Sequence, residues 1–126
     1  TRTYAPVFQQ ILKKFRKKIS GIIHCTGGGQ TKILHFVKNC RIIKNNMLEI
    51  PEIFNIIKQQ TNTSWKEMYE VFNMGHRMEI YCNSSLANEI INISRSFNIE
   101  AQIIGKVEKS DKKELIIESK GIKIEY

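Results

Sequence analysis

A glycine-rich stretch runs Gly21-Ile22-Ile23-His24-Cys25-Thr26-Gly27-Gly28-Gly29-Gln30-Thr31. Its apolar pair, Ile22-Ile23, predicts a short buried strand. Apolar residues then recur at helical spacing, so we expect a helix from about Gln30 or Thr31 to about Lys38. A strand, a glycine loop and a helix N-terminus in this order are typical of anion sites, because glycines leave room for a ligand against bare N–H groups.

The loop amides would contribute more to anion binding than the helix dipole. The dipole offers an anion roughly 0.3–1 kcal/mol, whereas each charge-assisted hydrogen bond from an N–H group offers about 1.5–3 kcal/mol. The predicted phosphate ligands are therefore the amides of Gly27, Gly28 and Gly29. A tight strand-to-helix turn without a ligand is the alternative, and the glycines alone do not decide between the two.

The composition is that of an ordinary globular protein with an excess of basic residues. The chain has 126 residues, enough for one domain with one core, and its 20 Lys and Arg against 12 Asp and Glu give a net charge of +8. This balance favours anionic partners in general, such as nucleic acid, nucleotides or a membrane surface. The densest basic cluster, Lys13-Lys14-Phe15-Arg16-Lys17-Lys18, interleaves with apolar residues at helical spacing, which indicates a solvated helix face.

The cysteines bear on the redox compartment of the protein, and the hydropathy pattern bears on whether it spans a membrane. Cys25, Cys40 and Cys82 are far apart, have no zinc-type spacing and suit a reducing compartment. No apolar run of about 18 residues exists, so we expect no membrane span, and no signal peptide is visible. The chain opens on Thr1-Arg2-Thr3 close to a helix, and we expect it to be a piece of a longer protein.

The remaining apolar periodicity and turn signals predict a mixed α/β (α+β) fold. Helices are expected at about 5–18, from 51 to the loop at 62–64, at 64–72 and at 84–97; strands are expected at 40–44, 77–82, 101–107, 115–117 and 122–124. The last two strands are expected to form a hairpin. Together these elements predict a mixed β-sheet with helices packed on it, in a single domain of residues 1–126.

Side-chain patterns predict which faces are buried and which residues cap the helices. Met78, Ile80 and Cys82 alternate with Arg77, Glu79 and Tyr81, so the first three are expected on the buried face of their strand. The helix after Pro51 is expected to bury its apolar residues, which are Ile53, Phe54, Ile57 and Ile56. Helix caps are expected at Ser64 (with Glu67), at Ser84 or Ser85, and at Gly75.

The common nucleotide-binding motifs are absent. Gln30 stands where a P-loop needs Lys, and there is no dinucleotide fingerprint. His24 precedes the loop and is either a contact to a substrate oxygen or phosphate, or a His satisfied by nearby backbone. Thr26 either offers its hydroxyl to the same anion or caps the turn. For His35 and His76 no partner is evident, and we expect structural roles.

Several segments carry longer motifs, in order along the chain. They are Thr1-Arg2-Thr3-Tyr4, His24-Cys25-Thr26-Gly27-Gly28-Gly29, Pro51 with Ile53-Phe54 and Ile57, Met68-Tyr69-Glu70-Val71-Phe72-Asn73-Met74-Gly75, and Ile103-Ile104-Gly105-Lys106-Val107. These segments resemble T-R-x-Y, H-x-T-G-G-G, P-x-[IL]-F-x-[LI]-[IL], M-Y-x-x-F-N-M-G and V-I-G-x-V of the AIR synthase family, the phosphoribosylformylglycinamidine cyclo-ligases. The resemblance spans almost the whole chain.

Two segments depart from the family pattern. The family usually continues G-G-G-L-T-E-N-L-P-R, whereas Gly29 is followed here by Gln30-Thr31-Lys32-Ile33-Leu34-His35-Phe36. His76-Arg77 stands where small or apolar residues are common in the family. The glycine core is intact, so the anion role carries over. The substrate roles of the missing acidic and Arg positions do not.

The resemblance implies the C-terminal domain of an ATP-dependent cyclo-ligase of purine biosynthesis. In that reaction ATP phosphorylates the amide oxygen of formylglycinamidine ribonucleotide. A nitrogen then attacks the activated carbon, and aminoimidazole ribonucleotide, ADP and phosphate result. The family enzyme is a homodimer, and its N-terminal domain, absent from this chain, supplies most of the ATP and Mg²⁺ site.

The resemblance also implies roles for individual residues. Thr26, Gly27, Gly28 and Gly29 would bind substrate or phosphate, and His24 would contact the substrate. Supporting roles fall to Asn73 and Gly75, with no metal ligand in this chain. A cytoplasmic location with no nucleic-acid or membrane partner is implied.

Two other functions stay open on the sequence. A basic nucleic-acid-binding module is supported by the +8 charge and the lysine-rich first helix, but the aromatic residues are not grouped on one strand for base stacking. A regulatory domain that binds a nucleotide without chemistry is the other. The sequence does not tell whether the loop takes a substrate 5′-phosphate or the phosphate from ATP, nor whether the isolated domain is a monomer.

Overall fold

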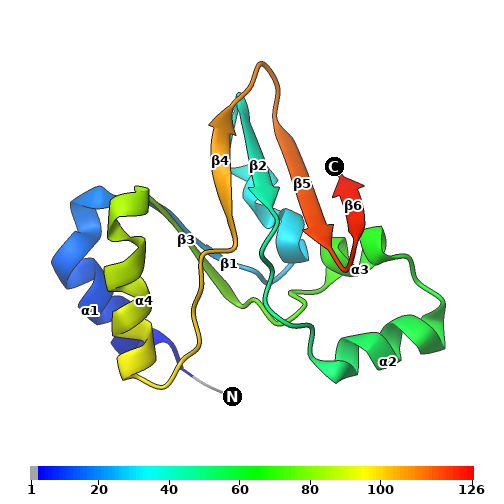
Figure 1. The fold of residues 1–126 in the computed structure, drawn as a ribbon, viewed down its shortest axis with the longest axis horizontal. Helices are drawn as coiled ribbons and strands as arrows, with labels where there is room; N and C mark the ends of the chain where they lie inside the picture. Colours follow the sequence, from blue (N-terminus) through cyan, green and yellow to red (C-terminus); the bar gives the residue numbers. More distant parts are fainter. Residues whose placement is uncertain (1–2) are drawn as a thin grey trace. The chain divides into compact units, whose positions relative to one another are not determined.

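The computed structural model describes residues 3–126, so Thr1 and Arg2 of the T-R-x-Y segment lie outside the described residues. Helices and strands alternate along the chain in a mixed α/β fold, as predicted (Figure 1). Contacts divide the chain into two compact units, which are Thr1–Ile22 with Ile80–Ile103 and Ile23–Glu79 with Ile104–Tyr126. A single-domain organisation stays a prediction.

The first unit is built on two helices. α1 (Ala5–Phe15) packs against α4 (Ala87–Ser96), which follows the 3-10 turn η3 (Ser84–Leu86) (Figure 1). Their apolar stripes share one core, formed by Val7, Ile11, Phe15, Leu86, Ile90 and Ile93. The basic face of α1 is exposed, as predicted, and Lys14 pairs with Glu89 at 3.2 Å on the surface.

The end of the first helix differs from the prediction. The helix ends at Phe15, a 3-10 turn η1 (Arg16–Lys18) follows, and β1 (Ile19–His24) begins at once. Ser20 and Gly21, which follow the expected end of the helix at about 18, lie inside this strand. Ile19 packs against the core of the first unit, so the extended backbone begins where that contact is made.

The predicted caps are confirmed at one helix and wrong at another. Ser64 Oγ accepts a hydrogen bond from the Glu67 amide at 3.2 Å, as the capping-box spacing predicts. Ahead of α4, the capping side chain is that of Asn83, whose Oδ1 accepts from the Ser85 amide at 3.0 Å. Ser84 and Ser85 were expected to cap, but the 3-10 turn moves the cap one residue upstream.

β1 pairs with β3 (Met78–Cys82) in a two-stranded sheet. His24 is exposed while its neighbours Ile23 and Cys25 are buried, which confirms the predicted alternation. The predicted faces of β3 are only partly confirmed, because Met78, Ile80 and Cys82 are half-buried, Tyr81 is half-buried too, and Glu79 of the expected polar face is buried. Glu79 is only 5% exposed, because its carboxylate meets a buried lysine.

The second unit contains a four-stranded mixed sheet, as predicted. Its strands are β2 (Cys40–Lys44), β4 (Gly105–Lys109), β5 (Glu114–Ser119) and β6 (Ile122–Glu125), in the order β4-β2-β5-β6. β2 runs antiparallel to β4 and parallel to β5, and β5 runs antiparallel to β6. Lys120 and Gly121 (φ 52° and 74°) close the predicted β5–β6 hairpin, since a two-residue turn of this kind needs positive φ at both positions.

β4 begins later than predicted. The strand was expected to start at Ala101, but the ladder with β2 starts at Gly105. Just before it, the Ile104 carbonyl accepts from the amides of Asn45 and Asn46 at 3.0 and 2.9 Å. Two residues therefore face one, as at a bulge, and regular pairing ends there.

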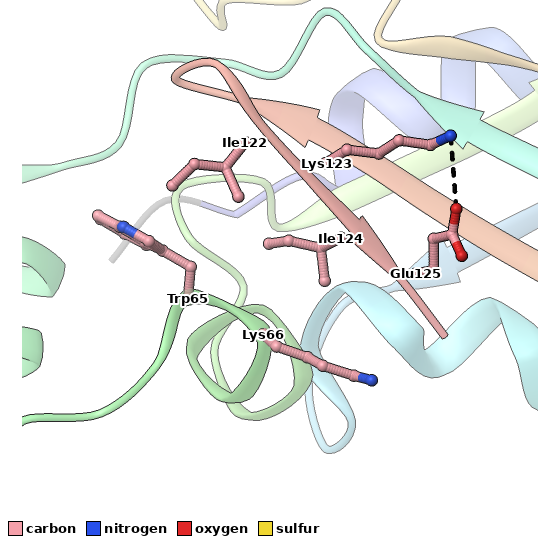
Figure 2. A pocket seen from close by; sticks show the side chains of 6 residues that line it. All are labelled: Trp65, Lys66, Ile122, Lys123, Ile124 and Glu125. Atoms are coloured by element: carbon pink, nitrogen blue, oxygen red, sulfur yellow. Dashed lines mark ion pairs between the residues drawn. The ribbon is translucent and has the colours of Figure 1, made fainter.

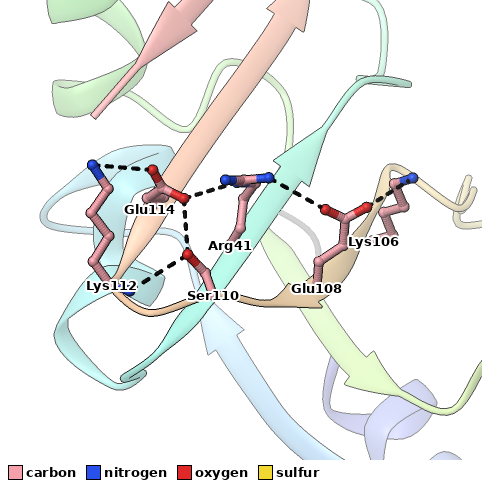
Figure 3. A network of polar contacts seen from close by, with 6 residues as sticks. All are labelled: Arg41, Lys106, Glu108, Ser110, Lys112 and Glu114. Atoms are coloured by element: carbon pink, nitrogen blue, oxygen red, sulfur yellow. Dashed lines mark hydrogen bonds and ion pairs between the residues drawn. The ribbon is translucent and has the colours of Figure 1, made fainter.

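The strand register places charged residues of β4 and β5 next to a charged residue of β2. Arg41 lies opposite Glu108 of β4 and Glu114 of β5. Its guanidinium bonds Glu114 at 2.8 Å and lies 3.7 Å from the Glu108 carboxylate, with Ser110 and Lys112 completing the contacts on Glu114 (Figure 3). This network links the three strands at a partly exposed surface, where each ion pair adds little to stability because water screens it.

The helical elements of the second unit are η2 (Gly29–His35), α2 (Glu52–Thr61) and α3 (Trp65–Val71). The prediction that α2 buries its apolar residues is wrong for Ile53 and Ile56, which are 56% and 46% exposed. α2 packs on α3 through Phe54, whose ring lies 5.7 Å from that of Phe72. The Lys58 ammonium also lies 4.9 Å from the centre of the Trp65 ring, and Ile57 is half-buried. Ile53 and Ile56 are left exposed because no element within the described residues covers them.

Candidate anion-binding site

The glycine loop has a left-handed backbone over three successive residues. The φ angles are 52° at Gly27, 98° at Gly28 and 49° at Gly29. Amides on either side of the glycines are hydrogen-bonded within the chain. Thr26 N–H donates to His24 O at 2.8 Å, and Thr31 N–H donates to Gly28 O at 2.9 Å. None of the three glycine amides makes a hydrogen bond within residues 3–126. Gly27 is exposed, Gly28 is half-buried and Gly29 is buried, so the three unused donors line the loop from its surface inward and could serve an anion.

The three glycines differ in what surrounds them. A Cβ on Gly29 would lie 2.5 Å from Phe72 O and 2.6 Å from Tyr69 O, so backbone packing alone excludes a side chain there. A Cβ on Gly27 would meet nothing within 4 Å, and one on Gly28 would meet only Lys32 at an ordinary 3.6 Å. Packing therefore explains one glycine, while the other two leave an open backbone surface.

His24 and Thr26 are both exposed and flank the loop on its N-terminal side, as predicted. Cys25 between them is buried at 2% exposure. The alternation thus places the two proposed ligand contacts on the opposite side from the core. Their roles as ligands stay predictions.

The expected helix after the loop is a 3-10 helix, η2, and it ends at His35 rather than near Lys38. In an α-helix the Gln30 carbonyl would accept from an amide four residues on. Here that carbonyl accepts from the Lys44 ammonium at 2.8 Å. This tertiary hydrogen bond anchors the start of η2, and local periodicity does not record such a contact.

The segment that resembles M-Y-x-x-F-N-M-G packs directly under the loop. Asn73 Oδ1 accepts from the Gly75 amide at 2.9 Å, and Asn73 O accepts from Gln30 Nε2 at 2.6 Å. Gly75 (φ 98°) is not the predicted cap of α3, whose C-cap is Phe72. A Cβ on Gly75 would lie 2.8 Å from the Pro51 ring. Asn73 and Gly75 thus lie in the turn that supports the loop, and their functional importance stays a prediction.

A buried polar cluster, which the sequence analysis missed, lies behind the loop. Lys44 Nζ donates to Gln30 O, Gln30 Oε1 and Glu79 Oε1 at 2.8, 2.9 and 2.5 Å. Gln30, Lys44 and Glu79 are 0%, 1% and 5% exposed. Lys44 and Glu79 lie in strands and Gln30 lies at the start of η2, and none of these positions carries a local sequence signal of the contact.

His76 adjoins this cluster, since its carbonyl accepts from Gln30 Nε2 at 3.4 Å, and its structural role stays a prediction. It is 3% exposed, and neither ring nitrogen has a hydrogen-bond partner in the described part of the chain. Burial lowers the pKa of His76 to about 4, against a smaller opposing effect of Glu79. The imidazole is therefore neutral at pH 7.

This neutral histidine predicts a loss of stability in acid. Below pH 6.5 the unfolded chain binds a proton that the folded chain does not bind until about pH 4. Unfolding should therefore become easier by about 2 kcal/mol between pH 7.5 and pH 5. Urea denaturation of the unsubstituted protein and of His76→Leu at the two pH values checks this. The variant should lose that part of the dependence, whereas the exposed-site control His24→Gln should keep it; equal slopes in all three proteins would contradict it.

Cys25 is predicted to be unreactive. Burial, with a further contribution from Glu79, raises the pKa of the Cys25 thiol to about 12. Its thiolate fraction at pH 8 should be on the order of a thousandfold below that of an ordinary cysteine. Titration with a disulfide reagent should label two thiols quickly in the folded protein and three in urea. Fast labelling of three thiols without urea, or of one fewer after Cys25→Ala, would refute the prediction.

Other features of the described chain add no ligand to this site. No group of three or more His, Cys, Asp or Glu side chains within residues 3–126 is placed to hold a metal ion. Among the same residues, no helix combines the length and apolar character that crossing a bilayer requires. A shallow surface hollow lies between α3 and β6, lined by Trp65, Lys66, Ile122, Lys123, Ile124 and Glu125, and contains none of the predicted site residues (Figure 2).

The chain is similar to known proteins both in sequence and in fold. Residues 3–118 match the family described as AIR synthase related protein, C-terminal domain. The chain is 36% identical to the phosphoribosylformylglycinamidine cyclo-ligase of Syntrophus aciditrophicus, over 88% of this chain and 32% of that protein. It is 34% identical to the protein of the same name from Methanococcus vannielii, over 86% of this chain and 30% of that protein. The chain thus spans about a third of the length of these relatives.

Solved structures extend the similarity of fold. The crystal structure of E. coli HypE, a hydrogenase maturation protein, superposes with a TM-score of 0.72 at 16% identity, over 98% of this chain and 39% of that one. The HypE–HypF complex gives a TM-score of 0.69 at 17% identity. At such identities the likeness concerns the fold alone.

Proposed function

The chain belongs to the family of AIR synthase related proteins, as their C-terminal domain, and on this premise we propose that it serves an ATP-dependent phosphoribosylformylglycinamidine cyclo-ligase of purine biosynthesis. The observation that supports this most directly is the glycine loop, whose three amides are unused and whose exposed neighbours are His24 and Thr26. The enzyme would convert formylglycinamidine ribonucleotide and ATP to aminoimidazole ribonucleotide, ADP and phosphate.

We assign this chain the task of holding a phosphate and the substrate. The amides of Gly27, Gly28 and Gly29 and the hydroxyl of Thr26 would bind phosphate oxygens, and His24 would contact the substrate. Two charge-assisted bonds from amides are worth roughly 3–6 kcal/mol, enough to position a phosphate without a lysine in the loop. The positive charge of Lys32 acts close by, since it lowers the pKa of the Cys25 thiol, although more weakly than burial raises it.

The remaining parts of the active site are proposed to lie outside this chain. ATP supplies the phosphoryl group that activates the amide oxygen of the substrate. A preceding domain would bind ATP and Mg²⁺, and the full-length enzyme would be a cytoplasmic homodimer. We do not propose nucleic-acid binding, because the exposed lysines of α1 lie opposite an apolar stripe on an ordinary amphipathic helix and one of them, Lys14, already pairs with Glu89.

An activity assay tests the proposed function. The full-length protein should release ADP only when formylglycinamidine ribonucleotide is present, and this chain alone should release none. Thr26→Val should lower kcat/KM about tenfold, which is 1.4 kcal/mol of transition-state stabilisation, while the melting temperature stays within about a degree. ADP release that does not depend on this ribonucleotide would contradict the assigned substrate, and activity of the chain alone would contradict the missing ATP site.

A further inference from the structure

We propose that Lys44, Gln30 and Glu79, called here the lysine cluster, position the glycine loop and strengthen the Gly29 amide as a donor to the bound phosphate. The inference deepens the proposed function and rests on its assignment of the loop as the anion site. None of the three residues is assigned a contact with the ligand. They act through the backbone of the loop, as positioning residues.

The lysine cluster connects three separate elements at one point. Lys44 is the last residue of β2, Gln30 lies in the first turn of η2, and Glu79 lies in β3. The Lys44 ammonium has three acceptors within 2.9 Å, two of which belong to Gln30. All three residues are nearly or fully inaccessible, so the charge acts in a medium of low dielectric constant, where it polarises its neighbours strongly.

A chain of hydrogen bonds leads from this charge to the loop. Lys44 Nζ donates to Gln30 O, whose peptide unit carries the Thr31 N–H. That N–H donates to Gly28 O at 2.9 Å, and the peptide unit of this carbonyl carries the Gly29 N–H. The described chain has no cis peptide, so each N–H points opposite to the carbonyl of its own unit. Hydrogen bonds in series polarise one another, and the terminal donor becomes stronger.

Gln30 adds a mechanical link. Its Oε1 accepts from Lys44 while its Nε2 donates to Asn73 O at 2.6 Å. The backbone of η2 is therefore held to β2 on one side and to the turn after α3 on the other. Thr31 Oγ1 also donates to Gly28 O at 2.8 Å, which fixes the same carbonyl a second time. The loop amides are thus presented in one arrangement before any ligand arrives, which lowers the cost of binding.

The chemistry of the cluster fits positioning better than simple core packing. Apolar residues of similar volume usually stabilise a core as well as or better than a buried ion pair. Here the buried side chain of Gln30 is polar, and both of its polar atoms are bonded to residues that orient the loop.

The test compares two charge-neutral double substitutions on strand β2. Lys44→Met with Glu79→Met removes the buried pair and keeps apolar volume. The control, Arg41→Met with Glu114→Met, removes a partly exposed pair on the same strand that has no contact with the loop. The full-length protein is labelled with ¹⁵N-glycine, and inorganic phosphate is the probe. Amide shifts are recorded without phosphate and during titration, and KM and kcat are measured for each variant.

We expect the Gly29 amide proton to move upfield in the buried-pair variant even without phosphate, with the control unchanged. The phosphate Kd and the KM should rise about tenfold, which is 1.4 kcal/mol, with kcat changed less than KM. A folded variant with the Gly29 shift, Kd and KM of the control would overturn the proposal. Should the double variant not fold, Gln30→Met, which keeps the ion pair, is measured instead. A smaller upfield shift of the Gly29 amide proton is then expected, and no shift would overturn the proposal.

The anion site and the positioning role of the lysine cluster can be contradicted separately. If phosphate shifts no loop amide in the unsubstituted protein, the anion site of the proposed function is wrong. The Gly29 shift without phosphate still shows whether the lysine cluster polarises the loop. If phosphate shifts the loop amides equally in both double variants, the anion site stands and the positioning role is wrong.

Discussion

Gly29→Ala is expected to destabilise the protein by about 3–5 kcal/mol, because the new methyl group meets backbone that has no room to move. Its Cβ would lie 2.5 Å from Phe72 O and 2.6 Å from Tyr69 O, and the residue has a φ of 49°. Relief would require η2 to separate from the end of α3. Urea denaturation at neutral pH measures the loss.

Gly121→Ala is the matched control. Gly121 has a φ of 74° in the β5–β6 turn, and nothing lies within 4 Å of its added Cβ. It should therefore cost only the backbone strain of about 1–2 kcal/mol. If the two variants lost equal stability, the packing of the loop against α3 described above would be wrong.

Lys44→Met alone is expected to cost about 3–5 kcal/mol, because it leaves the Glu79 carboxylate buried without its cation. Glu79 is 5% exposed and its Oε1 lies 2.5 Å from Lys44 Nζ. Adding Glu79→Met to the same protein should recover most of the loss, since no buried charge then remains. The free energy of unfolding of the two single variants and of the double variant gives the coupling directly.

The exposed pair on the same strand again provides the comparison. Arg41→Met and Glu114→Met should each cost far less than Lys44→Met, because both side chains reach solvent. Additive losses at Lys44 and Glu79 would mean that the two groups do not form the buried pair.

The elements with strong local patterns could be predicted from the sequence. The stripe of α1, the capping box at Ser64 and the alternation around His24 are confirmed, because each depends on neighbours within a few residues. The end of α1 and the start of β4 were misplaced. Both are decided by contacts with distant segments, such as that between Ile104 and the amides of Asn45 and Asn46.

The candidate site, too, could be predicted from the sequence only in part. The glycine loop, with its exposed Thr26, follows from the local sequence. The lysine cluster does not, because Lys44 and Glu79 are 35 residues apart and each lies in a strand whose pattern gives no sign of a buried charge. The exposure of Ile53 and Ile56 also could not be predicted, since periodicity shows which face of a helix is apolar and not whether another element covers it.

Gly28→Ala in the full-length enzyme shows whether the glycine loop binds a phosphate. Gly28 has a φ of 98°, and its added Cβ would meet only Lys32 at 3.6 Å. The cost to folding should therefore resemble that of Gly121→Ala, about 1–2 kcal/mol. The methyl group would also push the ligand off the amides, where two lost charge-assisted bonds are worth roughly 3–6 kcal/mol.

KM and the melting temperature are measured on Gly28→Ala and Gly121→Ala side by side. We expect similar falls in melting temperature for the two variants and a KM raised at least tenfold, or about 1.4 kcal/mol, in Gly28→Ala alone. A normal KM in Gly28→Ala together with a lowered melting temperature would make the loop a plain turn and contradict the claim.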